Sequence, residues 1–332
     1  MGSLFPCLPD EIGWECLLRV ELNSHHNLRC VCKSWNAALK NPHFYRERKR
    51  LKISERRICM LQLIDGVCNR VVVYDLEKNS CKNLPPIPTE INGVVHSHFL
   101  KQKLVLIVDF VADFGCVWLY DFVCSEWRQG AKMPRCQKGA EFACATDEHG
   151  GLIYVGGGYH HQEGNHIYCL GSASVYNVEE DKWDVLPDMN TWGSIGAFAD
   201  GKFYVMGYDK FEVFDSYTRS WKNMENRFDS TLFVSGFGRL HCLSDRELIE
   251  YDYSQDKLNI VGTIPIEDWG QLVNLCLVVS NKILVGKWHP IQGQYFYMLE
   301  PPSESAGTVK VIRIDRPSGL QGFAISAATL DL

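Results

Sequence analysis

Residues 152–183 read LIYVGGGYHHQEGNHIYCLGSASVYNVEEDKW, and this stretch decides the fold. It opens with an aliphatic and aromatic run that ends in glycines, and it closes with Tyr176-Asn177 and, six residues after Asn177, Trp183. β-Branched and aromatic residues favour strands, and an Asn between two such runs favours a tight turn. The stretch therefore predicts antiparallel strands joined by a hairpin, with Trp183 on the returning strand packed against a neighbouring sheet.

The same hairpin pattern recurs along the chain. An aromatic residue is followed by Asp or Asn at Tyr74-Asp75, Tyr120-Asp121, Tyr176-Asn177, Phe214-Asp215 and Tyr251-Asp252. Six residues after the polar member of each pair come Cys81, Trp127, Trp183, Trp221 and Leu258. The 276 residues from 57 to 332 divide into six units of 46 residues, each long enough for four strands. The pattern predicts a mainly β fold, a six-bladed β-propeller.

The two ends of this repetitive region complement each other. Phe323-Ala324-Ile325-Ser326-Ala327-Ala328 resembles the inner strand of the other units, but no further strands follow it. The first unit, at Ile58, begins without an inner strand. We therefore expect the segment at about 321–330 to complete the first blade of a propeller over residues 58–332, so that the ring has no open sheet edge.

The residues before the repeats have a helical pattern. Leu8-Pro9-Asp10-Glu11 predicts a helix start, because proline is tolerated in the first turn and carboxylates interact favourably with the positive end of the helix dipole. Apolar residues at Leu28, Val31, Cys32, Trp35 and Leu39 predict one second helix, which Pro42 ends. A region this small buries little apolar surface by itself, so part of that surface is expected to wait for a partner.

A basic segment connects the two regions. It contains Arg46, Arg48, Lys49, Arg50, Lys52, Arg56 and Arg57. We interpret residues 49–57 as a linker helix with a solvated face, because Glu47 and Glu55 interrupt the run. A nuclear-localisation or nucleic-acid patch is the alternative interpretation.

Composition restricts the possible partners and compartments. The formal charge is −6 and the pI is about 6.0, which argues against a nucleic-acid binder. The apolar runs are too short to span a membrane, and the first residues lack the pattern of a signal peptide, so we expect a cytoplasmic and/or nuclear protein with no membrane partner. The 14 cysteines are scattered among apolar neighbours and are interpreted as reduced core residues.

The amino-terminal segment, residues 1–48, resembles an F-box. The resemblance rests on Leu8-Pro9-Asp10-Glu11-Ile12, on residues 15–20 and on Val-Cys-Lys-Ser-Trp at 31–35. It implies docking onto the Skp adaptor and, through the adaptor, onto a cullin. The matching contact positions are Leu8, Pro9, Ile12, Leu17, Leu18, Leu28, Val31 and Trp35.

The repeats resemble kelch repeats, most closely from Ile153 to Trp183, and the whole chain is similar to plant kelch-repeat F-box proteins. The resemblance implies a non-catalytic substrate receptor of a Skp-cullin-F-box ubiquitin ligase. Related proteins capture enzymes such as phenylalanine ammonia-lyase and chalcone synthase. Loops between the second and third strands and between blades are expected to form the target-binding rim, with Arg135, Trp192, Arg227, Phe228, Trp269, Trp288, His289 and Arg316.

Catalytic chemistry has weaker support in the sequence. His160, His161 and His166 share one inserted loop and could bind a metal, but a Gly-rich polar loop more often holds solvated histidines. The sequence contains no nucleophile elbow or phosphate-binding loop. We therefore expect no catalytic residues, no metal and no cofactor. A kelch-type enzyme, a metal-dependent lyase and a non-degradative scaffold are the alternatives.

Overall fold

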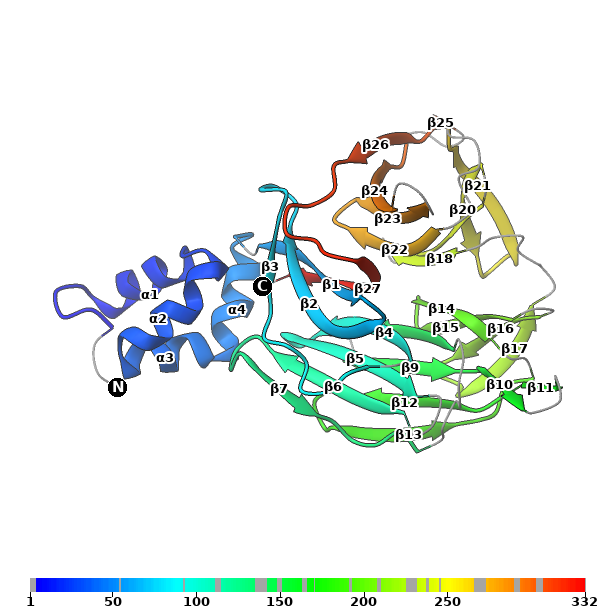
Figure 1. Ribbon diagram of the computed structural model, residues 1–332, viewed down its shortest axis with the longest axis horizontal. Helices are drawn as coiled ribbons and strands as arrows, with labels where there is room; N and C mark the ends of the chain where they lie inside the picture. The colour runs from blue at the N-terminus through cyan, green and yellow to red at the C-terminus, as the bar shows by residue number, and fades with distance from the viewer. Residues whose placement is uncertain are drawn as a thin grey trace.

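The chain forms a lobe of helices followed by a ring of β-sheets (Figure 1). These elements are seen in a computed structural model. The residues that it describes are 4–53, 55–91, 93–110, 115–134, 142–147, 151–162, 166–169, 171–190, 193–207, 210–224, 232–236, 239–244, 246–265, 273–289, 293–302 and 307–331.

The ring is a six-bladed propeller, so the predicted fold class is confirmed. From the inner to the outer strand, blade 1 contains β27 (Phe323–Asp331), β1 (Arg56–Ile64), β2 (Val67–Asp75) and β3 (Ser80–Asn83). Blade 2 contains β4 (Gly93–Leu100), β5 (Lys103–Phe110), β6 (Cys116–Asp121) and β7 (Glu126–Gln129). Blade 3 contains β8 (Ala143–Asp147), β9 (Leu152–Gly156), β12 (Ala173–Asn177) and β13 (Lys182–Leu186). In the same order, blade 4 contains β14 (Gly193–Ala199), β15 (Lys202–Gly207), β16 (Phe211–Asp215) and β17 (Ser220–Met224). Blade 5 contains β18 (Leu232–Gly236), β19 (Arg239–Leu243), β20 (Glu247–Asp252) and β21 (Lys257–Thr263). Blade 6 contains β22 (Val273–Val279), β23 (Lys282–His289), β24 (Gly293–Glu300) and β26 (Lys310–Ile314).

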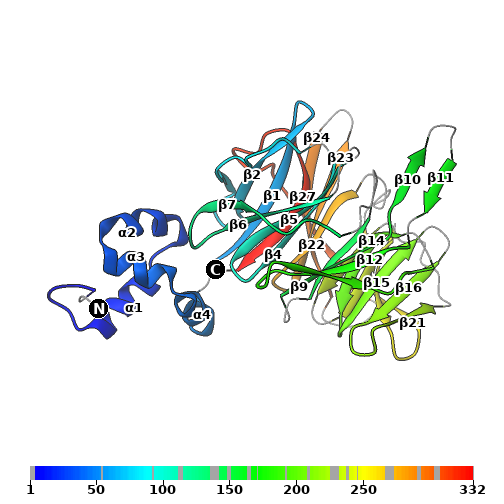
Figure 2. The same ribbon diagram turned by 90° about the horizontal axis from the view of Figure 1, so that it is seen from below.

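Two smaller strand pairings extend the ring. β25 (Gly307–Thr308) adds a short parallel strand to the edge of β21. β10 (Tyr159–Gln162) and β11 (His166–Cys169) form a separate hairpin between β9 and β12 of blade 3. Figure 2 shows this hairpin at the end of the molecule remote from the helices.

The first blade contains strands from both ends of the ring. β27 pairs antiparallel with β1, from Arg56 opposite Asp331 to Leu63 opposite Phe323. Each strand thereby covers an edge of the other that would otherwise present unpaired backbone groups. This pairing closes the ring between its first and last strands.

The turn between the third and fourth strands has the same construction in blades 1 to 5. In blade 2 the Asp121 carboxylate accepts the backbone N–H groups of Val123 and Cys124 at 2.7 and 3.0 Å. A residue with positive φ, Ser125 in this blade, then reverses the chain. The equivalent polar residues are Asp75, Asn177, Asp215 and Asp252, and the equivalent positive-φ residues are Asn79, Asp181, Arg219 and Asp256.

The residue on the returning strand joins neighbouring blades. Trp127 lies opposite Tyr120, and its indole N–H donates to the carbonyl of Pro85 in the preceding segment at 2.8 Å. Trp183 and Trp221 make equivalent bonds to Ala131 and Pro187. The predicted hairpin and its packing against a neighbouring sheet are therefore confirmed.

The helical lobe differs from the predicted pair of helices. It contains α1 (Asp10–Leu18), the 3₁₀ turn η1 (Leu22–Ser24), α2 (His25–Val31), α3 (Lys33–Lys40) and α4 (Pro42–Arg50). The single helix expected through Leu28 and Leu39 is wrong, because Cys32 is extended at φ −159° and ψ 166° and separates α2 from α3. The sulfur of Cys32 caps α3 by accepting the N–H of Trp35 at 3.5 Å.

The expected linker helix over residues 49–57 is also wrong. Pro42 occupies the first turn of α4, where its missing N–H costs little, and so begins a helix as well as following one. The helix ends at Arg50, and Arg56 and Arg57 already belong to β1. Most of the expected solvated basic face is exposed, namely Arg46, Lys49, Arg50, Lys52 and Arg56, but Arg48 and Arg57 are buried.

Four histidines of the described residues lie wholly or partly in the interior, namely His25 and His241, which are buried, and His96 and His98, which are half-buried. His98 of β4 has its Nε2 atom 2.9 Å from the Cys144 sulfur of β8, and His96 packs against Phe142. Burial lowers the pKa of His96 to about 4 and that of His98 to about 3. In the helical lobe, burial lowers the pKa of His25 to about 4. These imidazoles are neutral in the folded chain at pH 7.

We predict that mild acid destabilises the fold through these histidines. The unfolded chain takes up protons near pH 6.5, and the folded histidines do so only near pH 3–4, so the free energy of unfolding falls as pH is lowered from about 6.5 towards 4. The expected loss at about pH 5 is on the order of 1–2 kcal/mol per histidine. Urea unfolding at about pH 7.5 and about pH 5 measures it.

Two substitutions test the origin of this pH dependence. His98→Gln is expected to reduce the loss between the two pH values, because glutamine does not titrate. His26→Gln, at an exposed position of α2, is the matched control and is expected to leave it unchanged. An equal loss in the parent and in both variants would contradict the assignment to buried histidines.

Candidate functional site

The helical lobe exposes several large apolar side chains. Among the residues that the structure describes, seven large apolar side chains are exposed, and three of them lie in the lobe: Leu8 at 41%, Ile12 at 50% and Val31 at 60%. Pro9 is exposed beside Leu8. We call these four residues, together with the half-buried Leu28 and Trp35, the docking face. Exposed apolar surface of this kind is typical of a protein interface.

Trp35 belongs partly to the packing of the lobe. Its indole N–H donates to the carbonyl of Leu4 at 2.7 Å, and its ring lies 4.9 Å from that of Phe5. Both partners come from the residues that precede α1, so Trp35 fixes that segment beside α3. The tryptophan therefore packs within the lobe, not against the ring.

Leu17 and Leu18 do not share the docking face. Each is only 1% exposed, and both belong to a cluster of buried apolar side chains that includes Phe44 and Tyr45 of α4 and also Cys59 of the ring. Their positions in α1 thus support the lobe from its interior. The structure separates these two residues from the other six positions that the resemblance implied.

A chain of buried charges connects the lobe to blade 1. Arg48 of α4 donates to the carbonyls of Leu18 and Val20 at 2.5 and 2.7 Å and pairs with Glu55 at 3.1 Å. Glu55 also pairs with Arg57, which reaches Asp75 at 2.7 Å. Burial lowers the pKa of Arg48, and the neighbouring Glu55 carboxylate opposes this shift. These contacts fix where the lobe joins the ring.

The lobe also rests on two of the repeated turns. Arg29 of α2 donates to the carbonyl of Phe122 at 2.7 Å and to the hydroxyl of Ser125 at 3.2 Å, both in the turn of blade 2. Lys78, in the turn of blade 1, pairs with Glu21 at 3.0 Å. The face of the ring that carries these turns is therefore the face that holds the helices.

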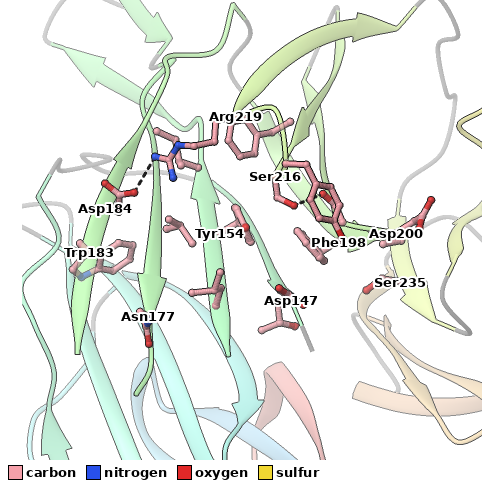
Figure 3. Close-up of a pocket in the computed structure, with 18 of the residues that line it drawn as sticks. Asp147, Tyr154, Asn177, Trp183, Asp184, Phe198, Asp200, Ser216, Arg219 and Ser235 are labelled. Atoms are coloured by element: carbon pink, nitrogen blue, oxygen red, sulfur yellow. Dashed lines mark hydrogen bonds and ion pairs between the residues drawn. The ribbon is translucent and has the colours of Figure 1, made fainter. Parts of the chain in front are cut away.

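A groove of about 920 Å³ lies between blades 3 and 4 (Figure 3). Its floor is aromatic: the rings of Tyr154 and Phe198 stack at 4.9 Å, and Phe214 lies beside them. Arg219, in the turn of blade 4, crosses to Asp184 of blade 3 at 2.9 Å. Because equivalent turns of blades 1 and 2 contact the lobe, the groove opens on the same face of the ring as the helices.

Tyr217 is the most exposed aromatic side chain of the groove. It is 85% exposed and lies over Gly201, where an added Cβ would stand 2.6 Å from its ring. Asp147, Asp200 and Ser216 also line the groove. An exposed aromatic ring beside carboxylates and an apolar floor can hold a segment of another protein.

The sequence reasoning missed this groove. The repeated turn has a Glu, Val or Ser at the positions equivalent to Tyr217, namely Glu77, Val123, Glu179 and Ser254. A tyrosine in a turn position that is otherwise mostly polar was the available signal. The groove itself depends on how two blades meet, which no local pattern reports.

The expected rim is described only in part. Arg135, Trp192, Arg227, Phe228 and Trp269 lie outside the described residues. Trp288 packs against Phe323 at 6.2 Å, and Arg316 donates to the carbonyls of Leu320 and Gly322 at 3.3 and 2.9 Å. His289, at the end of β23, lies opposite Gly293. These three residues meet at one end of blade 6, on the face of the ring opposite the groove.

The histidine-rich insertion forms the β10–β11 hairpin. His160 pairs with Tyr168, and His166 pairs with Gln162. Among the residues that the structure describes, no group of three or more His, Cys, Asp or Glu side chains is arranged to hold a metal ion. No helix in the same part of the chain is long and apolar enough to cross a membrane.

Comparisons with known proteins match both regions of the chain. Residues 5–47 match the F-box domain family, and residues 143–190 match the Kelch motif family. The F-box/kelch-repeat proteins At1g80440 and At1g15670 of Arabidopsis thaliana are 30% and 31% identical over 228 and 232 residues. Each alignment covers 62% of this chain and 62% of the relative, so the chain spans about three fifths of their length.

Two further comparisons extend over more of the chain. The F-box/kelch-repeat protein At1g67480 of Arabidopsis thaliana is 27% identical over 349 residues, which is 98% of this chain and 89% of the relative. A chain in the crystal structure of a nidogen/laminin complex superposes with a TM-score of 0.55, over 82% of this chain and 98% of that one. Its sequence identity is 11%, so it shows similarity of fold alone.

We predict that Arg48 contributes strongly to stability. Arg48→Met removes the buried cation and leaves Glu55 and two buried carbonyls with fewer partners, so a loss of about 3 kcal/mol in the free energy of unfolding is expected. Arg50→Met, in the same helix, breaks only the exposed pair with Glu47 and is expected to cost less than about 0.5 kcal/mol. Urea unfolding compares them; an equal loss in both would show that the buried charge chain does not hold the lobe.

Proposed function

Because the chain belongs to the F-box/kelch-repeat family, we propose that it is a substrate receptor of a Skp-cullin-F-box ubiquitin ligase. In this proposal the helical lobe binds the Skp adaptor, and the adaptor links the chain to a cullin. The propeller holds a target protein. The chain performs no bond chemistry itself; it raises the effective concentration of the target near the ubiquitin-carrying enzyme.

The docking face is the observation that carries this proposal. Leu8, Ile12 and Val31 lie within the residues that match the F-box domain, and the chain's own propeller leaves them exposed. Three large apolar side chains in a lobe of about fifty residues are costly to leave in water unless a partner covers them. Leu17 and Leu18 are buried in the lobe, so in this proposal they do not contact the adaptor directly.

We assign target binding to the groove between blades 3 and 4. It combines an aromatic floor, the exposed Tyr217 ring and a polar margin, which is the composition of a protein-binding hot spot. The expected rim with Trp288 and Arg316 lies on the opposite face and is the competing surface. Phenylalanine ammonia-lyase and chalcone synthase are the targets that the resemblance to plant relatives suggests.

We predict that Ile12→Asp with Val31→Asp abolishes adaptor binding. Each change places a carboxylate in an apolar interface that offers it no partner, so the affinity is expected to fall by at least about 100-fold. Both side chains are at least half exposed, so the lobe should still fold. Co-purification and a binding titration with the Skp adaptor measure the effect.

Val185→Asp is the matched control, because Val185 is a similar apolar residue, 40% exposed, on β13 of the ring. It should bind the adaptor like the parent chain. If the variant with Ile12→Asp and Val31→Asp binds the adaptor with the affinity of the parent chain, the docking face is not the adaptor-binding surface.

We predict that Tyr217→Ala with Arg219→Ala slows turnover of the target. The pair removes the exposed ring and the side chain that bridges the groove, and it leaves the docking face intact. Turnover of co-expressed phenylalanine ammonia-lyase or chalcone synthase, with and without proteasome inhibition, measures the effect. The groove variant should keep adaptor binding and slow turnover several-fold.

The competing surface supplies the control for this experiment. Trp288→Ala with Arg316→Ala alters the opposite face and should leave turnover unchanged. Slower turnover in this variant, with normal turnover in the Tyr217→Ala, Arg219→Ala variant, would place the target on that opposite face. Continued binding without turnover in the parent chain would indicate a non-degradative scaffold.

A further inference from the structure

The chain covers its repeated turns with its own lysines at two junctions between blades. At the junction of blades 4 and 5, Lys202 and Lys222 of blade 4 lie over the ring of Tyr253, with their Nζ atoms 4.6 and 5.8 Å from its centroid. Tyr253 belongs to the turn of blade 5. At the junction of blades 2 and 3, Lys101 of blade 2 pairs with Glu179, in the turn of blade 3, at 3.4 Å. In both places an aromatic ring or a carboxylate of the turn attracts cations from the preceding blade.

The groove lies at the junction between these two, where blade 3 meets blade 4. The strand register places Leu152 of blade 3 at the position of Lys202 in blade 4, and Asp184 at the position of Lys222. Both Leu152 and Asp184 line the groove. This junction therefore has an apolar residue and a carboxylate at the positions where the next junction has two lysines.

The turn of blade 4 is correspondingly open. Tyr217 is 85% exposed, whereas Tyr253, beneath the two lysines, is half-buried. The ring of Tyr217 lies over Gly201, which follows the exposed Asp200 in the chain. Figure 3 shows Asp200 on the side of the groove that also carries Ser216, the chain neighbour of Tyr217. An exposed aromatic face close to a carboxylate is a favourable place for an ammonium or guanidinium group.

The charge of the groove has the sign that such a group requires. The described lining contains four acidic and three basic residues, and two of the basic ones, Arg219 and Arg239, pair with Asp184 and with Glu250. Glu250 is not part of that lining, so it adds a further negative charge beside Arg239. The groove and its ion pairs therefore carry a net negative charge, which complements a cationic segment.

We infer that the groove recognises its target through a lysine or arginine side chain, whose cation lies on the exposed face of Tyr217. The inference rests on the proposed function, which assigns target binding to the groove. The chain's own contact of Lys202 with Tyr253 at the next junction is the model for this contact.

The size and floor of the groove define the rest of the occupant. A volume of about 920 Å³ is larger than one side chain needs, and the floor of Tyr154 and Phe198 is aromatic. Aromatic surface of this kind favours apolar neighbours of the cation. The occupant is therefore a short segment of the target protein in which Lys or Arg lies next to apolar residues.

The first experiment determines the preferred occupant without a known target. The full-length chain selects peptides from a phage-displayed library of short random sequences, and the Tyr217→Ala chain is treated in parallel. Peptides that only the parent chain retains are expected to contain Lys or Arg beside apolar residues, about threefold or more above the starting library. Retained peptides with the Lys and Arg content of the library, or equal retention by the Tyr217→Ala chain, would overturn the inference.

The second experiment titrates the chain with one selected peptide and with a counterpart in which Gln replaces its Lys or Arg. The neutral counterpart is expected to bind about tenfold more weakly. Tyr217→Phe keeps an aromatic face and should bind the cationic peptide within about twofold of the parent chain. Tyr217→Leu keeps apolar contact but has no aromatic face, and should bind it about fivefold more weakly. Equal affinities of the Phe and Leu variants would show that the ring makes only apolar contact, against the inference.

Two charge variants exclude a general attraction of basic peptides to an acidic chain. Asp200→Asn removes a carboxylate of the groove, and asparagine tolerates the positive φ of 49° at this position. It should weaken the cationic peptide roughly threefold and leave the neutral counterpart unchanged. Glu126→Gln, at an exposed position of β7 in blade 2, is the matched control and should bind both peptides like the parent chain. An equal loss in the two variants would contradict recognition in the groove.

The outcomes separate this inference from the proposed function. Slower target turnover in the groove variants, with no preference for cationic peptides, would overturn the inference and leave target binding in the groove. A chain that prefers cationic peptides through Tyr217 but does not bind the Skp adaptor would reject the proposed function. The preference of the groove for a cation would then still stand.

Discussion

The capped turn between the third and fourth strands is the constraint on which the rest of the structure depends. One carboxylate or amide oxygen satisfies two backbone N–H groups, a residue with positive φ reverses the chain, and the bulky residue on the returning strand packs opposite an aromatic ring. In three blades that residue is a Trp whose indole N–H reaches the preceding segment. The same turn thus shapes blades 1 to 5, and in blades 2 to 4 its Trp also attaches the blade to the segment that precedes it.

The same turns contact the helical lobe and line the groove. In blade 1, one oxygen of Asp75 caps the turn and the other pairs with Arg57, which continues the buried charges to the helices. In blade 2 the turn supplies the carbonyl that Arg29 binds, and in blade 4 it presents Tyr217 to the groove. The helical lobe and the groove therefore lie on the same face of the ring. In the proposed function, a target in the groove and the helical lobe are on the same face of the ring.

The parts of this architecture that were predictable from the sequence are those set by near neighbours in the chain. The Tyr-Asp pairs and the bulky residues six positions later predicted the hairpins because turn chemistry and cross-strand packing act within ten residues. The break at Cys32 was hidden because the apolar period of α2 continues through it into α3. The burial of Arg48 was hidden because its partners Leu18 and Val20 lie about thirty residues away. Likewise, Leu17 and Ile12 share a helix and an apolar character, and only the packing of α4 decides which of them is buried.

The way the lobe joins the ring explains why Ile12 and Val31 stay exposed. Part of the junction is apolar, through Phe44 and Tyr45, but its direction is fixed by directional contacts: Arg48 to Glu55, Arg57 to Asp75 and Arg29 to Phe122. Apolar contact alone is non-directional and would favour burying Ile12 and Val31 against the ring as well. Hydrogen bonds and buried ion pairs tolerate little displacement, so they hold the lobe in an orientation that leaves those side chains in water. The buried charges therefore specify an orientation that hydrophobic burial by itself would not select, and the docking face depends on them although none of them belongs to it.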